Sequence, residues 1–223
     1  MRAITHYESL EEDQPGTPCE ILTYPLEEDL ADLITDIKKA RREADIVVVS
    51  MHWGVHYFRA LIAGYQVLVA HAAIDAGADI IFGHHPHILK GVEVYKGKVI
   101  FYSLGNFAFD SHPKAVDTVW YSRRRKVYQG LFKVPAREEG SAFRFQPESR
   151  NSVIAKVTIC DKAIGQVSLV PVRINDRAQP EPLSASAPEG REVLRYLTDI
   201  SREAQLNASF TVAGDDAVIG QSQ

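Results

Sequence analysis

The sequence predicts an α/β fold in which parallel strands alternate with helices. Residues 27–43 have apolar positions at helical spacing, acidic residues in the first turn and basic residues near the end. The apolar run 46–50 predicts a buried strand. Residues 66–76 predict a second helix closed by Gly77, and residues 79–82 predict a second strand. This order of elements predicts a right-handed crossover and a parallel pair of strands.

The second half of the chain is richer in β patterns. Lys96-Gly97 is a two-residue hairpin turn between predicted strands at 92–95 and 98–103. Further strands are predicted at 128–134, 153–160 and 166–174, and residues 8–20 predict a surface loop. We expect residues 1–178 to form a domain. Residues 179–223 are expected to be a linker, a short helix at about residues 190–205 and a tail that frays.

The composition predicts a globular protein without a general affinity for polyanions. The 223 residues are 45% hydrophobic and 24% charged, and the formal net charge is −4. This balance argues against nucleic acid as a partner, so an anionic ligand needs a local site. The two cysteines form no metal-binding pair. We find neither a signal peptide nor a span of about 20 apolar residues, so the sequence leaves the cellular location unknown.

Histidines cluster where the two predicted parallel strands end. His52 follows the first strand, and His85 and His87 follow the second. Because parallel strands end at one edge of the sheet, these side chains are expected to lie close together. Neutral imidazole is a common ligand for transition metals, so the pattern predicts a metal site. A polar loop with a purely structural role is the alternative. His6, His71 and His112 are interpreted as surface or hydrogen-bonded residues.

Three motifs resemble a known bacterial family. They are His52-Trp53-Gly54, the run Asp-Ile-Ile-Phe-Gly-His-His-Pro-His at residues 79–87, and Tyr-Ser-Leu-Gly-Asn-Phe at residues 102–107. Together they resemble the CapA family of capsule and poly-γ-glutamate biosynthesis over about residues 26–174. That family resembles the calcineurin-like metallophosphoesterases. The resemblance therefore implies a metallophosphatase-like α/β/β/α sandwich, here partial because its early strands are missing.

The resemblance also implies a ligand set. His52 and His85 would share one divalent metal ion, and His87 would reach a second. Mn, Fe and Zn all suit imidazole ligands, and the sequence does not choose among them. His56, Lys90 and Asn106 are assigned to the surroundings of the metals or to substrate contacts, and no catalytic residue is identified.

Other ligands that the resemblance implies do not occur in this sequence. Family members carry a Gly-Asp, an Asn-Leu-Glu and an Asn-Asn-His segment upstream. We therefore expect residues 1–178 to be the C-terminal part of a CapA-like domain, completed by a further N-terminal segment or a separate N-terminal half. The chain alone is expected to bind metal weakly and to show little phosphoesterase activity.

The leading functional hypothesis is a metal-dependent phosphoester hydrolase of capsule or poly-γ-glutamate biosynthesis. The alternative is a non-catalytic scaffold that binds an anionic polymer or a membrane synthase complex, and an inert remnant is a third interpretation. The basic run 123–126 is either a contact for an anionic substrate or polymer, or a solvated loop. Members of the family are often membrane-anchored outside the cytoplasm, but this chain contains no predicted membrane span.

Overall fold

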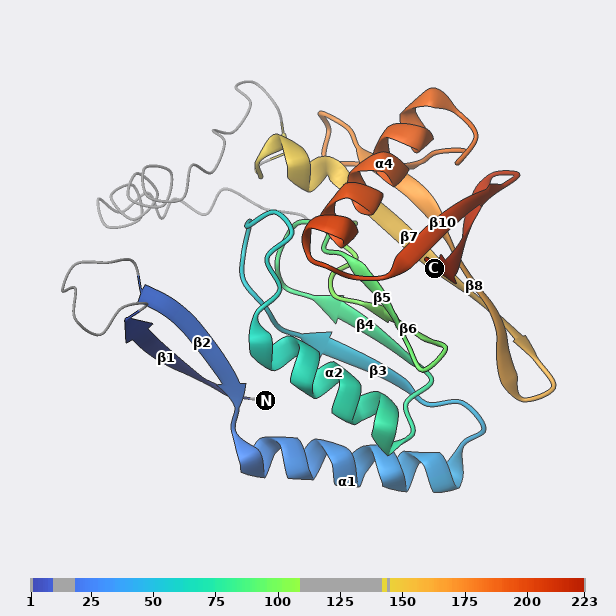
Figure 1. Cartoon of the computed structure of the whole chain (residues 1–223). Coiled ribbons are helices and arrows are strands. Elements are labelled where there is room, and N and C mark those ends of the chain that lie inside the picture. Colours follow the sequence, from blue (N-terminus) through green and yellow to red (C-terminus); the bar gives the residue numbers. More distant parts are fainter. Residues whose placement is uncertain (1, 10–18, 109–141, 144, 223) are drawn as a thin grey trace.

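The computed structural model describes residues 2–9, 19–108, 142–143 and 145–222 (Figure 1). The first half contains β1 (Ala3–Ser9), β2 (Cys19–Pro25), α1 (Glu27–Glu43), β3 (Val48–His52), α2 (Gly64–Ala76), β4 (Ile80–His84), β5 (Val92–Tyr95) and β6 (Lys98–Phe101). The second half contains the 3-10 helix η1 (Pro147–Arg150), β7 (Asn151–Cys160), β8 (Ala163–Ile174), β9 (Pro180–Pro182), α4 (Pro188–Glu203), β10 (Ala208–Ala213) and β11 (Asp216–Gln221).

A four-stranded sheet carries the histidine-bearing loops. Its strand order is β3-β4-β6-β5, and β3, β4 and β6 are parallel while β5 joins antiparallel. The predicted parallel pair and the hairpin at Lys96-Gly97 are therefore confirmed. Helices α1 and α2 lie together beside this sheet (Figure 1). Alternate strand residues such as Ile81 and Ile100 pack in one apolar cluster with Val69 and Ile74 of α2.

The opposite face of this sheet packs in a second cluster. Ile80 and Phe101 point there and share the cluster with Leu169 of β8 and with Val193 and Leu197 of α4. Strand β8 belongs to a second sheet of order β10-β11-β8-β7, with β9 paired to β8. The first sheet thus has two helices on one face and a second sheet with α4 on the other. The predicted α/β class and metallophosphatase-like fold are confirmed.

The C-terminal region differs from the linker and fraying tail that the sequence predicted. Its helix is α4, close to the predicted residues 190–205, but β9 replaces the linker and β10 and β11 replace the tail. Strand β11 pairs antiparallel with both β10 and β8. Ala217 and Ala208 are buried in the core shared with α4. These small residues lack the apolar bulk that normally marks a core strand, so their pattern predicted a tail.

The N-terminal segment also differs from the prediction. Residues 3–9 and 19–25 pair as a two-stranded antiparallel sheet, although residues 8–20 were expected to form a loop. Strand β2 contacts α2, and Thr23 Oγ1 accepts a hydrogen bond from the backbone N–H of Tyr65 at 3.2 Å. Residues 10–18, the predicted strand 128–134, the basic run 123–126 and His112 lie outside the described residues. No helix in the described part of the chain is long and apolar enough to cross a membrane.

Close packing at Gly83 sets the spacing between the ends of β3, β4 and β6. The indole N–H of Trp53 donates to the backbone oxygen of Tyr102 at 3.0 Å, and Trp53 is only 3% exposed. A Cβ atom on Gly83 would lie 2.2 Å from that oxygen and 2.5 Å from the indole nitrogen. Glycine at this position is therefore required for the strand ends to meet.

We predict that Gly83→Ala lowers the free energy of unfolding by about 3 kcal/mol or more, because the backbone of Tyr102 and the Trp53 ring must both move. Gly165→Ala in β8 is the matched control. Its new Cβ would meet nothing closer than Cys160 Sγ at 3.6 Å, so we expect a change within about 1 kcal/mol. Urea unfolding followed by circular dichroism measures both, and equal effects of the two substitutions would contradict the packing argument.

Candidate metal centre

Three loops meet at the edge of the first sheet where β3, β4 and β6 end. The backbone N–H of Trp53 donates to His84 O at 3.0 Å, and that of Leu104 donates to Gly83 O at 3.1 Å. Farther out, the N–H of Tyr57 donates to Pro86 O at 3.0 Å. These hydrogen bonds join the loops after β3 and β6 to the end of β4 and to the loop after it. The histidines that the loops after β3 and β4 carry therefore have defined relative positions.

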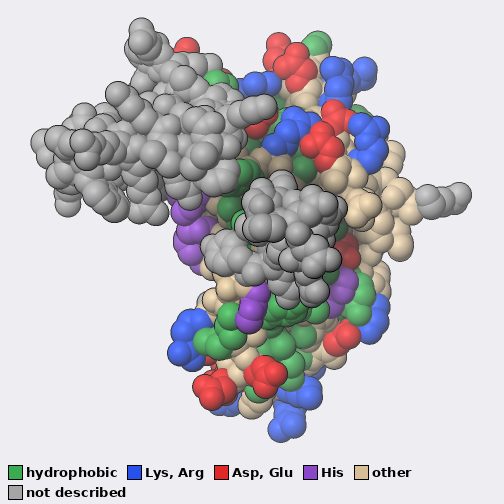
Figure 2. All heavy atoms as spheres, turned by 60° about the vertical axis from the view of Figure 1, so that its left-hand side comes forward, with side chains coloured by type: hydrophobic (Ala, Val, Ile, Leu, Met, Phe, Trp, Pro, Cys, Tyr) green, Lys and Arg blue, Asp and Glu red, His purple; other side chains and the backbone are tan. Residues whose placement is uncertain are grey.

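The imidazole rings of His52, His56, His85 and His87 form one cluster. His85 Nδ1 lies 2.8 Å from His52 Nε2, and their ring centroids are 4.5 Å apart. The ring of His56 lies 3.8 Å from that of His85 and 5.6 Å from that of His87. The structure thus brings together the three residues predicted as ligands. The ring of His56 lies near the rings of both His85 and His87. Figure 2 shows histidine side chains at separate places on one face of the molecule, some of them beside hydrophobic side chains.

Unusual backbone conformations aim the rings of the second loop. His85 has a φ of 102° and His87 has a φ of 56°, on either side of Pro86. Residues other than glycine rarely adopt positive φ, and each such position costs of the order of 1–3 kcal/mol. Two such positions, separated only by Pro86, lie in the loop that carries these rings, and unusual backbone conformations of this kind favour the hypothesis of a functional site.

Burial keeps several of these rings neutral. Burial, followed by the charges of His85, His87 and His52, lowers the pKa of His56 to about 4. Burial, followed by the neighbouring histidines, also lowers the pKa values of His84 and His85. Neutral imidazole has a nitrogen lone pair that protonated imidazole lacks, so the lowered pKa values of His56 and His85 favour the form that can donate to a cation.

The other predicted residues take two different positions. Asn106 is only 5% exposed, and its Oδ1 lies 2.7 Å from His87 Nδ1, so it belongs to the cluster. Lys90 is fully buried, and its ammonium donates to the backbone oxygen of Phe58. This hydrogen bond places the Lys90 charge beneath the loop after β3, where it supports the backbone. Two histidines outside the cluster behave as interpreted, since His71 pairs with Glu93 at 2.8 Å and His6 lies against Tyr24, whereas the interpretation of His112 is not tested.

The donor set fits part of a metal centre. Two imidazole nitrogens bound to one ion at about 2.0–2.1 Å in tetrahedral geometry lie roughly 3.3 Å apart. The 2.8 Å between His85 Nδ1 and His52 Nε2 is shorter, so these rings would separate slightly to admit a cation. Among the described residues, no three His, Cys, Asp or Glu side chains are arranged to hold one ion. A complete centre therefore needs additional donors.

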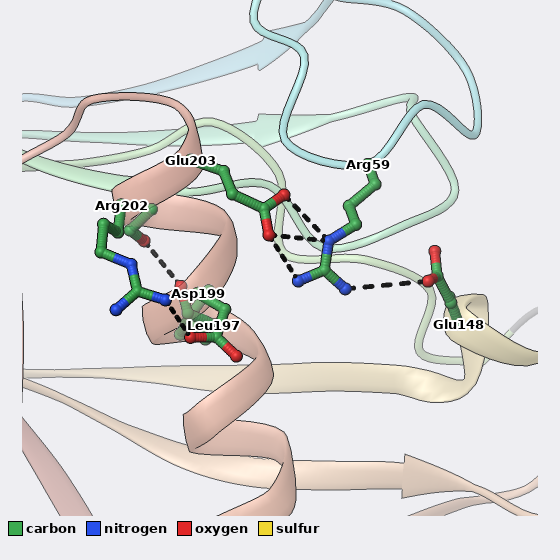
Figure 3. Close-up of polar contacts among 7 residues, drawn as sticks. Arg59, Glu148, Leu197, Asp199, Arg202 and Glu203 are labelled. Carbon is green, nitrogen blue, oxygen red and sulfur yellow. Dashed lines mark hydrogen bonds and ion pairs between the residues drawn. The ribbon is translucent and has the colours of Figure 1, made fainter.

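An ion-pair network connects the loop after β3 to the second half of the chain (Figure 3). The Arg59 guanidinium contacts both carboxylate oxygens of Glu203 on α4, with Nη2 2.9 Å from Oε1. Its Nη1 lies 3.8 Å from Glu148 Oε1 of η1, and the guanidinium lies 5.0 Å from the Tyr196 ring centroid. The pairs are partly exposed, so each contributes little energy. Their joint effect is to position this loop against α4 and η1.

Aromatic rings border the cluster on the side of His87. The ring of Phe145 stacks on His87 with centroids 4.8 Å apart, and the Tyr57 ring lies 6.2 Å from it. Sequence reasoning missed Phe145, Arg59 and Glu148 as neighbours of the cluster. Phe145 and Glu148 lie far along the chain in a segment without a recognisable motif, so no local signal identifies them.

Comparison with known proteins identifies relatives of this sequence. Residues 3–111 match the family model described as bacterial capsule synthesis protein PGA_cap. The PGA biosynthesis protein CapA of Bacillus subtilis (strain 168) is 34% identical over 168 residues, which cover 75% of this chain and 35% of that protein. The chain belongs to the CapA family.

Other relatives match shorter stretches. The capsule biosynthesis protein CapA of Bacillus anthracis is 51% identical over 82 residues, covering 35% of this chain and 20% of that protein. A probable polyglutamine synthesis accessory protein of Mycobacterium tuberculosis (strain ATCC 25618 / H37Rv) is 37% identical over 99 residues, covering 44% of this chain and 25% of that protein. The chain thus spans about a third or less of the length of these CapA-family relatives.

Buried Lys90 gives this CapA-family chain a pH-dependent stability. Burial lowers the pKa of Lys90 from 10.5 to about 8. Between these values the unfolded chain holds a proton that the folded chain has released, so the free energy of unfolding rises with pH. We expect a rise on the order of 2 kcal/mol between about pH 7.5 and pH 9.5.

Lys90→Met should abolish most of this rise, whereas Lys39→Met on the exposed face of α1 should leave it intact. Urea titrations at several pH values give the slope of the free energy of unfolding against pH for the wild type and for each of the two variants. The same slope in wild type and Lys90→Met would show that Lys90 does not titrate with folding.

Proposed function

We propose that this chain contributes imidazole ligands to a divalent-metal phosphoesterase centre that acts in capsule or poly-γ-glutamate biosynthesis. The observation that supports the proposal is the convergence of His52, His85 and His87 from two loops at one sheet edge. Membership of the CapA family supports the biosynthetic context. Mn, Fe and Zn all fit the imidazole donors.

The histidines of this chain would bind metal ions, and neighbouring residues would hold these histidines in place. His52 Nε2 and His85 Nδ1 face each other and would hold one ion between them, while His87 would hold a second with the help of donors from outside the described residues. A pair of bound metal ions supplies an activated water and neutralises charge on phosphate oxygens. Trp53 and Gly83 keep the strand ends in place, and Phe145 and Tyr57 border the space beside His87.

A second candidate function is a non-catalytic scaffold that binds an anionic polymer or a synthase complex. It is favoured by the absence, among the described residues, of three His, Cys, Asp or Glu side chains arranged around one ion. Metal binding distinguishes the two candidates, because the scaffold needs no cation at the cluster.

We predict that the chain binds Zn²⁺ or Mn²⁺ with modest affinity and that His52→Ala or His85→Ala weakens binding by at least about tenfold, since each removes a ligand. His6→Ala removes an imidazole from β1, away from the cluster, and should leave the affinity unchanged. Calorimetric titration of each variant measures the affinities.

The hydrolytic part of the proposal requires a second measurement. Hydrolysis of a chromogenic phosphoester by the chain with saturating Mn²⁺ should be slow, and it should rise when a segment carrying the carboxylate and Asn-Asn-His motifs is added. Metal binding that is unaffected by both cluster substitutions, or polymer binding by metal-free protein, would favour the scaffold.

A further inference from the structure

Asn106 makes three contacts at the base of the histidine cluster. It follows β6 in the loop after Phe101, and its side chain is almost completely buried. Its Oδ1 lies 2.7 Å from His87 Nδ1. Its Nδ2 donates to His87 O at 3.1 Å and points to Ser149 O at 3.5 Å. The side chain therefore joins the ring and the backbone of His87 to η1.

These contacts fix which way the amide of Asn106 points. An amide nitrogen only donates and an amide oxygen only accepts. In the reversed orientation, the Asn106 oxygen would face the carbonyl oxygens of His87 and Ser149 without a hydrogen between them. The backbone carbonyls therefore require Nδ2 on their side and Oδ1 on the side of the His87 ring.

The orientation of the amide in turn fixes the proton on the ring. Because Oδ1 has no hydrogen to donate, the 2.7 Å contact requires His87 Nδ1 to carry one. A neutral imidazole with its proton on Nδ1 has its lone pair on Nε2. The contact between His52 and His85 gives no such assignment, since either of the facing nitrogens can carry the shared proton.

We propose that Asn106 is a positioning residue that holds His87 as the Nδ1–H tautomer, so that Nε2 is the atom of His87 that would bind a divalent metal ion. The role of Nε2 as a metal ligand rests on the proposed function. The tautomer does not, because it follows from the hydrogen bonds of Asn106. The hydrogen bond from Nδ2 to His87 O also stabilises the left-handed backbone of His87, whose φ is 56°. One side chain thereby sets both the orientation of the ring and its protonated nitrogen.

The test is the tautomer of His87 in metal-free protein. Protein labelled with ¹⁵N in its histidines is measured at pH 8.5 by long-range ¹H–¹⁵N correlation, which distinguishes protonated from unprotonated ring nitrogens. The His87→Gln variant identifies the His87 signals by their loss. We expect Nδ1–H in the wild type and a shift toward Nε2–H, the form that an unconstrained ring favours, in Asn106→Ala.

Two further variants separate positioning from a general effect on packing. Asn106→Asp keeps an oxygen toward the ring and should retain the proton on Nδ1, although its second oxygen faces the carbonyls of His87 and Ser149 and is expected to lower the stability of the fold. Asn207 makes a similar pair of hydrogen bonds, with Val94 N and Val94 O at 2.8 and 3.0 Å. Asn207→Ala therefore removes a comparable amide far from the cluster, and His87 should remain Nδ1–H.

An Nε2–H signal for His87 in the wild type, or no shift in folded Asn106→Ala, would overturn the inference. If Asn106→Ala fails to fold, the tautomer of His87 in the wild type and in Asn106→Asp still tests the inference. Zn²⁺ titration supplies the second readout, with affinity expected to fall about 10- to 100-fold in Asn106→Ala. If wild-type His87 carries its proton on Nδ1 but the protein binds no Zn²⁺, the proposed function is refuted and the tautomer is still supported.

Discussion

The contact between Trp53 and the backbone of Tyr102 determines the arrangement of the histidine loops. It joins the residue after β3 to the residue after β6, across β4, and it exists only because Gly83 has no side chain. The ring of Trp53 also stacks on that of Tyr102, with centroids 5.8 Å apart. Three strand ends are thereby held at fixed spacing. The rings of the cluster depend on this spacing because His52 ends β3 and the other three histidines follow β3 or β4 within four residues.

Local signals were sufficient to predict the elements that carry the cluster. The charge order and apolar spacing of residues 27–43 predicted α1 at its observed bounds, and Gly77 ends α2 with a φ of 119°. The apolar runs before His52 and His85 predicted parallel strands, and parallel strands bring their ends together. The strands continue two residues further than predicted, to His52 and His84, because hydrogen bonding extends past the apolar run.

The remaining features depend on contacts between distant parts of the sequence. Strand β11 is stabilised by pairing with β8, some 50 residues away, and small residues such as Ala217 give no local pattern for it. Arg59 meets Glu203 only because α4 packs beside the first sheet. Asn106 was predicted near the cluster, but its contact with His87 could not be derived from the sequence, since the strand β6 and its loop must first be placed.

The central proposal is that the imidazoles clustered at one sheet edge of this CapA-family chain bind metal. A crystal soaked in Zn²⁺ and measured on both sides of the zinc absorption edge tests that claim directly. We expect an anomalous difference peak in contact with His52 Nε2 and His85 Nδ1, with these two rings moved slightly apart. An ordered cluster whose hydrogen bond between His52 and His85 persists, with no peak beside it at saturating Zn²⁺, would contradict the account.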